Sequence, residues 1–262
     1  MCKYLLHMER VLIKLWMKGQ YRRFWVLARL LLTRSLRLRI LAVIKNSKLS
    51  VSLSLSKLGA LHWIGKSLNW KKMGQWPSVR VEIPKPNRKD KRPLTVPHKS
   101  MRIYMGMLQL LLELIVRSSD TLGKEHKGSL PDCSVPKAWR GVIKYLQKRR
   151  GRGYISQYDF KSYFDNFNYS FIYETLTKLI KMDVKMAIHT IKLIRTPVGK
   201  QIGSSWALSK PTKGIGHGYA TSPILAALIL EHSKILREVG TILWPCIQLY
   251  FTPLIGILFA WI

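Results

Sequence analysis

The first part of the chain mixes apolar and basic side chains at the spacing of an amphipathic helix. Apolar residues recur from Phe24 through Leu27 and Leu31 to Leu38, with arginines between them. Residues 1–46 are therefore predicted to be helical. Three interpretations of this basic stretch stay open: an extension that faces RNA, a solvated basic face, or a helix on a membrane surface.

Beyond this stretch, apolar side chains recur at every second position, which is the spacing of a β-strand. Residues 79–83 alternate apolar and charged side chains and end at Pro84, and residues 92–96 resume an extended pattern after a charged turn. The two segments predict a β-hairpin. The stretch before it, residues 46–76, is rich in Ser, Lys and Gly, and is predicted to be a linker.

Both helices and strands are predicted beyond the hairpin. The apolar spacing predicts helices over residues 100–117 and 137–148, and a strand over residues 154–160. Ser170 and Ser222 each fit the N-cap position of a further helix. The mixture indicates an α+β fold.

The last segment, residues 239–262, carries no charged side chain. Its length fits a membrane span, but Pro245, Gln248 and Pro253 do not favour a clean one. A buried strand pair and an out-of-frame tail remain the alternatives.

The charge of the chain narrows the classes of partner. Lys and Arg number 45 against 13 Asp and Glu, a formal net charge of +32, and 47% of the residues are hydrophobic. A foldable chain this basic needs a polyanion, either nucleic acid or an anionic membrane, and nucleic acid offers the denser line of charge. Its three cysteines lie far apart, which argues against a zinc knuckle and a disulfide scaffold and favours a reducing compartment.

Three strings are candidates for chemistry. Asp159 ends a predicted strand and Asp165 follows six residues later, a pattern that suits Mg²⁺-dependent phosphoryl transfer or a plain strand end with a turn aspartate. Five cations in residues 83–94 form either a phosphate clamp or a solvated turn. The glycines of GIGHGYATSP, residues 214–223, either let a nucleic-acid backbone approach or form an ordinary loop.

The order of these strings resembles reverse transcriptases of the group II intron or organellar type. IPKPNRKDKRPLTVP resembles their fingers motif, YDFKSYFDNF is similar to the palm motif around the first catalytic aspartate, and GIGHGYATSP is similar to the template-grip motif. The likeness spans residues 20–235. It implies a partial right-hand polymerase with three parts: a basic helical extension and linker at residues 1–76, fingers and incomplete palm at residues 77–238, and a hydrophobic tail at residues 239–262.

The resemblance implies a role for each matching residue. Asp159 would hold both Mg²⁺ ions, and the backbone carbonyl of Phe160 would complete the metal shell. Phe164 would pack under the sugar of the incoming nucleotide, and Lys85 and Arg92 would bind its triphosphate.

The template and primer would pass along the Gly-rich turn. Gly214, His217, Gly218 and Ser222 match that motif, although Gly216-His217 replaces the Pro-Gln of the family. This departure removes a glutamine contact expected near the nascent base pair.

The family activity is RNA-directed DNA polymerisation, a nucleotidyltransferase reaction that uses Mg²⁺ and no small-molecule cofactor. The expected partners are an RNA template or intron RNA, a DNA primer and dNTPs, with weak membrane association also open. The expected location is the mitochondrion, with the chloroplast as alternative. No Tyr/Phe-x-Asp-Asp string follows Ser222, so we expect weak or absent activity. The alternative is a non-catalytic, maturase-like splicing factor that binds RNA.

Overall fold

A computed structural model describes most of the chain, and contacts divide it into two units. The first unit joins Met1–Ser118 to Phe164–Ser222, and the second joins Ser119–Tyr163 to Pro223–Ile262. The residues described are 3–34, 77–84, 91–119, 121–122, 136, 139–140, 143–144, 147, 155–160, 162–202, 205–233, 250–252 and 257–261. The predicted linker and Lys85 lie outside them.

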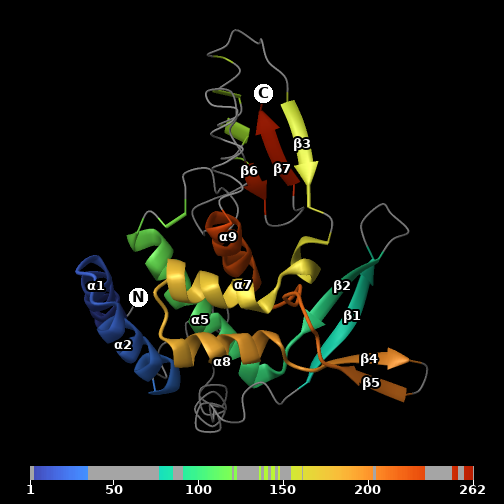
Figure 1. The fold of residues 1–262 in the computed structure, drawn as a ribbon, viewed down its shortest axis with the longest axis horizontal. Coiled ribbons are helices and arrows are strands. Elements are labelled where there is room, and N and C mark those ends of the chain that lie inside the picture. Colours follow the sequence, from blue (N-terminus) through green and yellow to red (C-terminus); the bar gives the residue numbers. More distant parts are fainter. Residues whose placement is uncertain are drawn as a thin grey trace. The chain divides into compact units, whose positions relative to one another are not determined.

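The first unit contains a mixed four-stranded sheet in the order β2-β1-β4-β5 (Figure 1). The strands β1 and β2 form the predicted hairpin, β4 and β5 form a second antiparallel pair, and β1 runs parallel to β4. Val79 and Val81 are 37% and 44% exposed, so the alternation along β1 does not mark a buried face. The strands are β1 (Ser78–Pro84), β2 (Lys91–Val96), β4 (Val198–Ile202) and β5 (Ser205–Ser209).

The first unit also contains helices, and α5 supplies much of its core. Tyr104, Leu108, Leu112 and Ile115 recur every three or four residues along α5 and are fully buried. The elements are α1 (Lys3–Met17), α2 (Tyr21–Arg34), α5 (Lys99–Ser118), the 3₁₀ turn η1 (Tyr163–Asn166) at the unit boundary, α7 (Tyr169–Glu174), the π turn η2 (Thr175–Leu179) and α8 (Val184–Ile194).

The basic N-terminal stretch forms two helices rather than the single helix expected from its periodicity. Gly19 separates them at a φ of 68°, a left-handed conformation that glycine adopts without steric cost. The second helix packs through Phe24 and Trp25, and the Trp25 indole nitrogen donates to the carbonyl of Ile180 at 3.4 Å. Residues 35–46 of the predicted helix lie outside the described residues.

The helix predicted to start near Ser170 begins one residue earlier, at Tyr169. The side chain of Asn168 caps it and accepts hydrogen bonds from both the backbone N–H and the hydroxyl of Ser170, at 3.0 and 2.9 Å. Ser170 was therefore the wrong N-cap. Asn and Ser are nearly equal as caps, so the local sequence does not separate them.

The second unit has a three-stranded antiparallel sheet and most of α9. The order is β3-β7-β6, so the described part of the C-terminal tail forms two strands that complete a sheet with β3. The α9 helix is buried along most of its length. The strands are β3 (Ile155–Asp159), β6 (Tyr250–Thr252) and β7 (Ile257–Trp261), and α9 runs over Ser222–His232.

Two further sequence-based expectations fall in this part of the chain. The described residues between positions 136 and 147 are helical, as predicted for that segment. Within the described residues, no helix has both the length and the apolar character needed to cross a membrane.

A buried group of three hydroxyls ties the first sheet to the Gly-rich turn at residues 214–222. The Tyr219 hydroxyl lies 3.1 Å from Ser78 Oγ and 3.0 Å from Thr196 Oγ1, and the last two oxygens lie 3.1 Å apart. Ser78 begins β1 and Thr196 precedes β4. The three hydroxyls therefore hold both strands and the turn together, and each can satisfy the others.

We predict that Tyr219→Phe destabilises the protein by about 1 kcal/mol, the usual net worth of a buried hydrogen bond. Urea unfolding measures this, and Tyr173→Phe, on the half-buried Tyr173 of α7, is the matched control. A double-mutant cycle with Ser78→Ala should show coupling. Equal stability of Tyr219→Phe and wild type would show that the hydroxyl group does not hold the turn.

We also predict that a buried histidine makes stability depend on pH. Burial, aided by the charge of Lys192, lowers the pKa of His189 to about 4, and its ring packs edge-on against Tyr104 at 5.5 Å. The neutral form of His189 is favoured in the folded state. Its contribution to the free energy of unfolding is therefore fully present above the unfolded pKa of about 6.5, and it is lost as the pH falls from about 6.5 to 4.

The loss over this window should be about 3 kcal/mol, because the unfolded state takes up the proton first. Urea unfolding between pH 7 and 4 measures it against His189→Leu, which cannot titrate. If wild type and His189→Leu lose stability in parallel over this range, the histidine is not responsible.

Candidate nucleic-acid site

The backbone of the Gly-rich turn is hydrogen-bonded to the segment that follows the predicted catalytic strand. The Gly214 N–H donates to the Phe167 carbonyl and the Ile215 N–H donates to the Phe164 carbonyl, each at 2.7 Å. The palm motif and the template-grip motif recognised in the sequence are thus brought together within the first unit.

The three glycines of the turn are required by the protein's own packing. A methyl group on Gly214 would come within 2.9 Å of the Asp165 carbonyl oxygen, and Gly214 also has a φ of +88°. A methyl group on Gly216 would come within 2.7 Å of the Tyr219 ring, and one on Gly218 would overlap the carbonyl oxygen of Thr95 on β2. The sequence-based explanation, close approach of nucleic acid, is not needed to account for these glycines. Passage of template and primer along the turn stays a prediction.

His217 is the side chain of the turn that lies over the start of the palm segment. Its ring centroid is 4.9 Å from that of Phe164, at an interplanar angle of 55°, and its Nε2 is 3.6 Å from Asp165 Oδ1. Phe164 also meets Phe167 edge-on at 6.3 Å. The arrangement places an aromatic ring, an imidazole and a carboxylate side by side, groups that can stack on a base or sugar and bond to its polar edges.

A cation beside this cluster was missed by sequence reasoning. Lys213 Nζ donates to Asn166 Oδ1 at 2.8 Å, and both side chains are exposed. The bond leaves the charge of Lys213 in solvent, where it can meet a phosphate. The two residues lie 47 positions apart, and neither carries a local signal of this contact.

Ser222 has a different role from the one expected. It is the first residue of α9, and its hydroxyl donates to the carbonyl of Gly216 at 2.7 Å. The same carbonyl accepts the N–H of Tyr219 at 3.2 Å. The N-cap prediction required the Ser222 side chain to accept a backbone N–H of α9. The side chain closes the turn instead.

The predicted triphosphate ligands are only partly described. Arg92 is exposed on β2, opposite Ile83, on the same strand as the Thr95 carbonyl that contacts the turn. An exposed guanidinium at this place is free to bind a phosphate. Lys85 lies outside the described residues.

The predicted metal ligands belong to the second unit. Asp159 is the last residue of β3 and pairs with Ile257 of β7. Phe160 stacks on Tyr163 at 5.1 Å, and the Tyr163 hydroxyl donates to the carbonyl of Ala226 at 2.9 Å. Burial raises the pKa of Tyr163 well above its ordinary value, so this phenol stays protonated.

The side chains that the structure describes form no metal-binding cluster. No three His, Cys, Asp or Glu side chains among them come close enough together to hold an ion. Asp165, the second carboxylate of the sequence pattern, belongs to the first unit and faces His217. The roles that the resemblance implies for Asp159 and Phe160 stay predictions.

Comparison with known proteins gives no match to any protein-family model and none to a curated protein sequence. Solved structures do match. A telomerase from Candida tropicalis, truncated from the C-terminal domain, has a TM-score of 0.52 at 14% identity, covering 76% of this chain and 48% of its own. The same enzyme in complex with a TWJ fragment of telomeric RNA has a TM-score of 0.53 at 14% identity, over 76% of this chain and 39% of its own.

A partial Cas6-RT-Cas1–Cas2 complex has a TM-score of 0.50 at 15% identity, covering 89% of this chain and 38% of its own. This chain thus spans less than half the length of the solved structures it resembles. At such identities the likeness concerns the fold alone. The chain has an α+β, reverse-transcriptase-like polymerase fold.

Proposed function

We propose that this chain is the fingers-and-palm part of an RNA-directed DNA polymerase of the group II intron or organellar type, and that it binds RNA. One observation carries the proposal: the three motifs follow one another in the family's order, and the chain that holds them has a reverse-transcriptase-like fold. The net charge of +32 supports a polyanionic partner.

The contacts within the first unit support nucleic acid as that partner. The ring of Phe164 and the imidazole of His217 lie 4.9 Å apart, at positions that match the nucleotide-binding and template-grip motifs. Lys213 adds a solvated charge beside them. Base, sugar and phosphate would each find a suitable group here.

Catalysis would need more metal ligands than the recognised motifs supply. Asp159 and the Phe160 carbonyl would contribute to a Mg²⁺ site, but phosphoryl transfer by two metal ions needs further carboxylates to clamp them. The sequence has no Tyr/Phe-x-Asp-Asp string to supply those groups. We therefore assign RNA binding to this chain, with weak or absent polymerisation.

The remaining partners follow from the family resemblance. They are an RNA template or intron RNA, a DNA primer and dNTPs, with Mg²⁺ as the cofactor of any chemistry and a mitochondrial or chloroplast setting. Weak membrane association belongs to the same set of proposals, and carbonate extraction of the organelle membrane tests it.

We predict that the 262-residue chain makes no cDNA in a primer-extension assay with Mg²⁺, dNTPs and an annealed RNA template. Losing a metal clamp removes several kcal/mol of transition-state stabilisation. An active reverse transcriptase on the same template is the positive control. Ready synthesis by this chain that disappears in Asp159→Asn would overturn the prediction and show an intact site.

We predict that the same chain binds RNA with a steep dependence on salt. If six or more phosphates are contacted, affinity should fall by about a thousandfold between about 50 and 200 mM salt, because counterions are released on binding. Fluorescence anisotropy with a labelled RNA measures the slope. If the chain shows no affinity for RNA at low salt, the proposed function is wrong.

A maturase-like splicing factor is the alternative, favoured by the basic charge. Such a factor needs phosphate contacts but no metal chemistry. The phenotype of Asp159→Asn in the organism separates the two functions: an unchanged phenotype selects the splicing factor, and a lost one selects the polymerase.

A further inference from the structure

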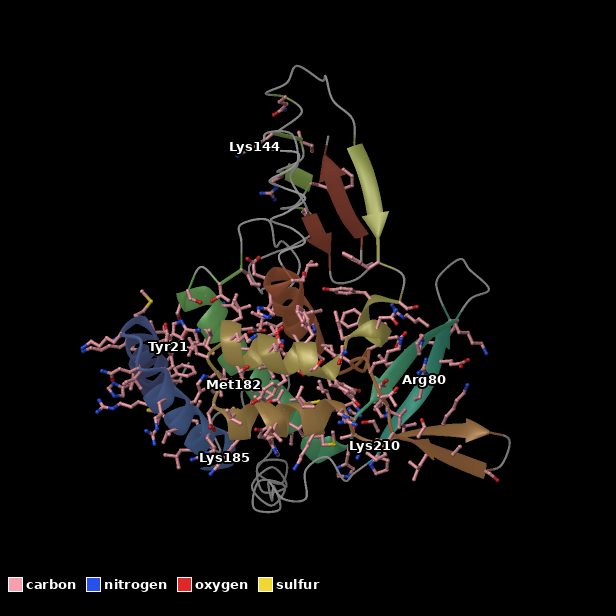
Figure 2. All side chains as sticks on the ribbon, viewed as in Figure 1. Tyr21, Arg80, Lys144, Met182, Lys185 and Lys210 are labelled. Carbon is pink, nitrogen blue, oxygen red and sulfur yellow. The ribbon has the colours of Figure 1, made fainter. Side chains whose placement is uncertain are left out.

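The α8 helix carries a row of lysines on the side that faces away from the core. Its inner side is buried through Met186, Ala187, His189, Thr190, Leu193 and Ile194. Lys185 and Lys192 are exposed on the other side, and Lys181 is exposed just before the helix. Figure 2 shows Lys185 on the opposite side of α8 from Met182, which is buried.

The lysines of this row carry uncompensated charge. No ion pair joins Lys181, Lys185 or Lys192 to an acidic group within the stretches that the structure describes. The nearest acid in sequence, Asp183, is half-buried and its carboxylate accepts the Lys185 backbone N–H at 3.4 Å as a helix cap. Lys178, by contrast, is already paired with Glu174 at 3.4 Å.

The spacing of the row fits a phosphate backbone. Lys185 and Lys192 are seven positions apart, which is about two helical turns and about 10 Å along the axis, so both project from one face. A nucleic-acid strand places several phosphates over that distance. Two long, flexible ammonium groups can adjust to neighbouring phosphates without a fixed geometry.

We propose that this lysine face (Lys181, Lys185 and Lys192) binds the phosphate backbone of RNA, away from the Gly-rich turn. The inference rests on the proposed function, in that the chain binds RNA, and adds a second contact surface. A second copy of the chain is a poor occupant, because each copy carries a net charge of +32.

An acidic protein is the less favoured occupant. Val184 and Ile188, which are 53% and 44% exposed, lie between the lysines and are the apolar groups of this face. A stable protein interface takes about 20–30 residues a side, with apolar anchors at its centre. Val184 and Ile188 are too few to form the apolar centre of a protein interface. Lying among three lysines, they are better suited to contact the sugars of an RNA backbone.

The test compares two double variants that remove the same charge. Lys185→Gln with Lys192→Gln removes two charges from the lysine face, and Lys178→Gln with Lys200→Gln removes two lysines that already pair with Glu174 and Glu82. All four side chains are exposed, so thermal unfolding should be unchanged. Anisotropy with a fluorescein-labelled single-stranded RNA, over a range of salt, gives the affinity and the salt slope.

The lysine-face variant should weaken RNA binding about tenfold at physiological salt. The salt slope, which is the slope of the logarithm of the binding constant against the logarithm of the salt concentration, should fall by about 1.4, or about 0.7 for each lost phosphate contact. The paired-lysine variant should change the slope by less than half of that. Restoring charge with Lys185→Arg and Lys192→Arg should restore the wild-type slope, because phosphates accept either cation.

Equal effects of the two glutamine variants would overturn the proposal while leaving wild-type RNA binding, and thus the proposed function, intact. An unchanged affinity in the lysine-face variant combined with a loss in Val184→Ser, Ile188→Ser would also overturn it, in favour of an apolar contact. A wild-type chain that binds no RNA would instead contradict the proposed function, a result that is seen before any variant is made.

Discussion

The arrangement of the candidate site depends on the close contact between Gly218 and the backbone of β2. Any side chain at this position would overlap the Thr95 carbonyl oxygen, so only glycine lets the turn lie against the strand. The next residue, Tyr219, can then reach the hydroxyls of Ser78 and Thr196. A steric constraint at one atom thus sets the position of the turn relative to β1, β2 and β4.

The same constraint decides which groups of the turn remain available for a ligand. The positions where Cβ atoms would stand on Gly214, Gly216 and Gly218 are occupied by Asp165, Tyr219 and Thr95. The His217 side chain lies over Phe164 and near the carboxylate of Asp165. Glycine here gives a rigid turn rather than a flexible one, because backbone bonds to Phe164 and Phe167 hold it.

Local patterns predicted the regular elements well. The hairpin of β1 and β2, the α5 helix and the strand ending at Asp159 were all placed within two residues of their observed bounds, because periodicity and turn residues act over short distances. The cap at Asn168 was missed because Asn and Ser serve almost equally well as caps. The break at Gly19 was missed because a single glycine is also tolerated inside a helix at a small cost. The segment that forms α8, β4 and β5 was not predicted at all.

The candidate site could be predicted only as far as motif order reaches. The family resemblance named Phe164 and His217, and the structure brings them together. The order of the motifs could not reveal the Asn166–Lys213 contact or the hydroxyl contacts of Tyr219. These contacts join residues that are 23 to 141 positions apart and carry no shared pattern. Such contacts arise from tertiary packing, and no local rule for helices, strands or turns specifies them.

Binding and chemistry make different demands on this chain. Phosphate contacts need exposed cations at loose spacing, and Lys185, Lys192 and Lys213 are exposed cations. Metal-dependent transfer needs several carboxylates at fixed positions, and it fails when one of them is missing. The proposed affinity for RNA would therefore be spread over many side chains, whereas a metal-dependent chemical step would be concentrated in a few.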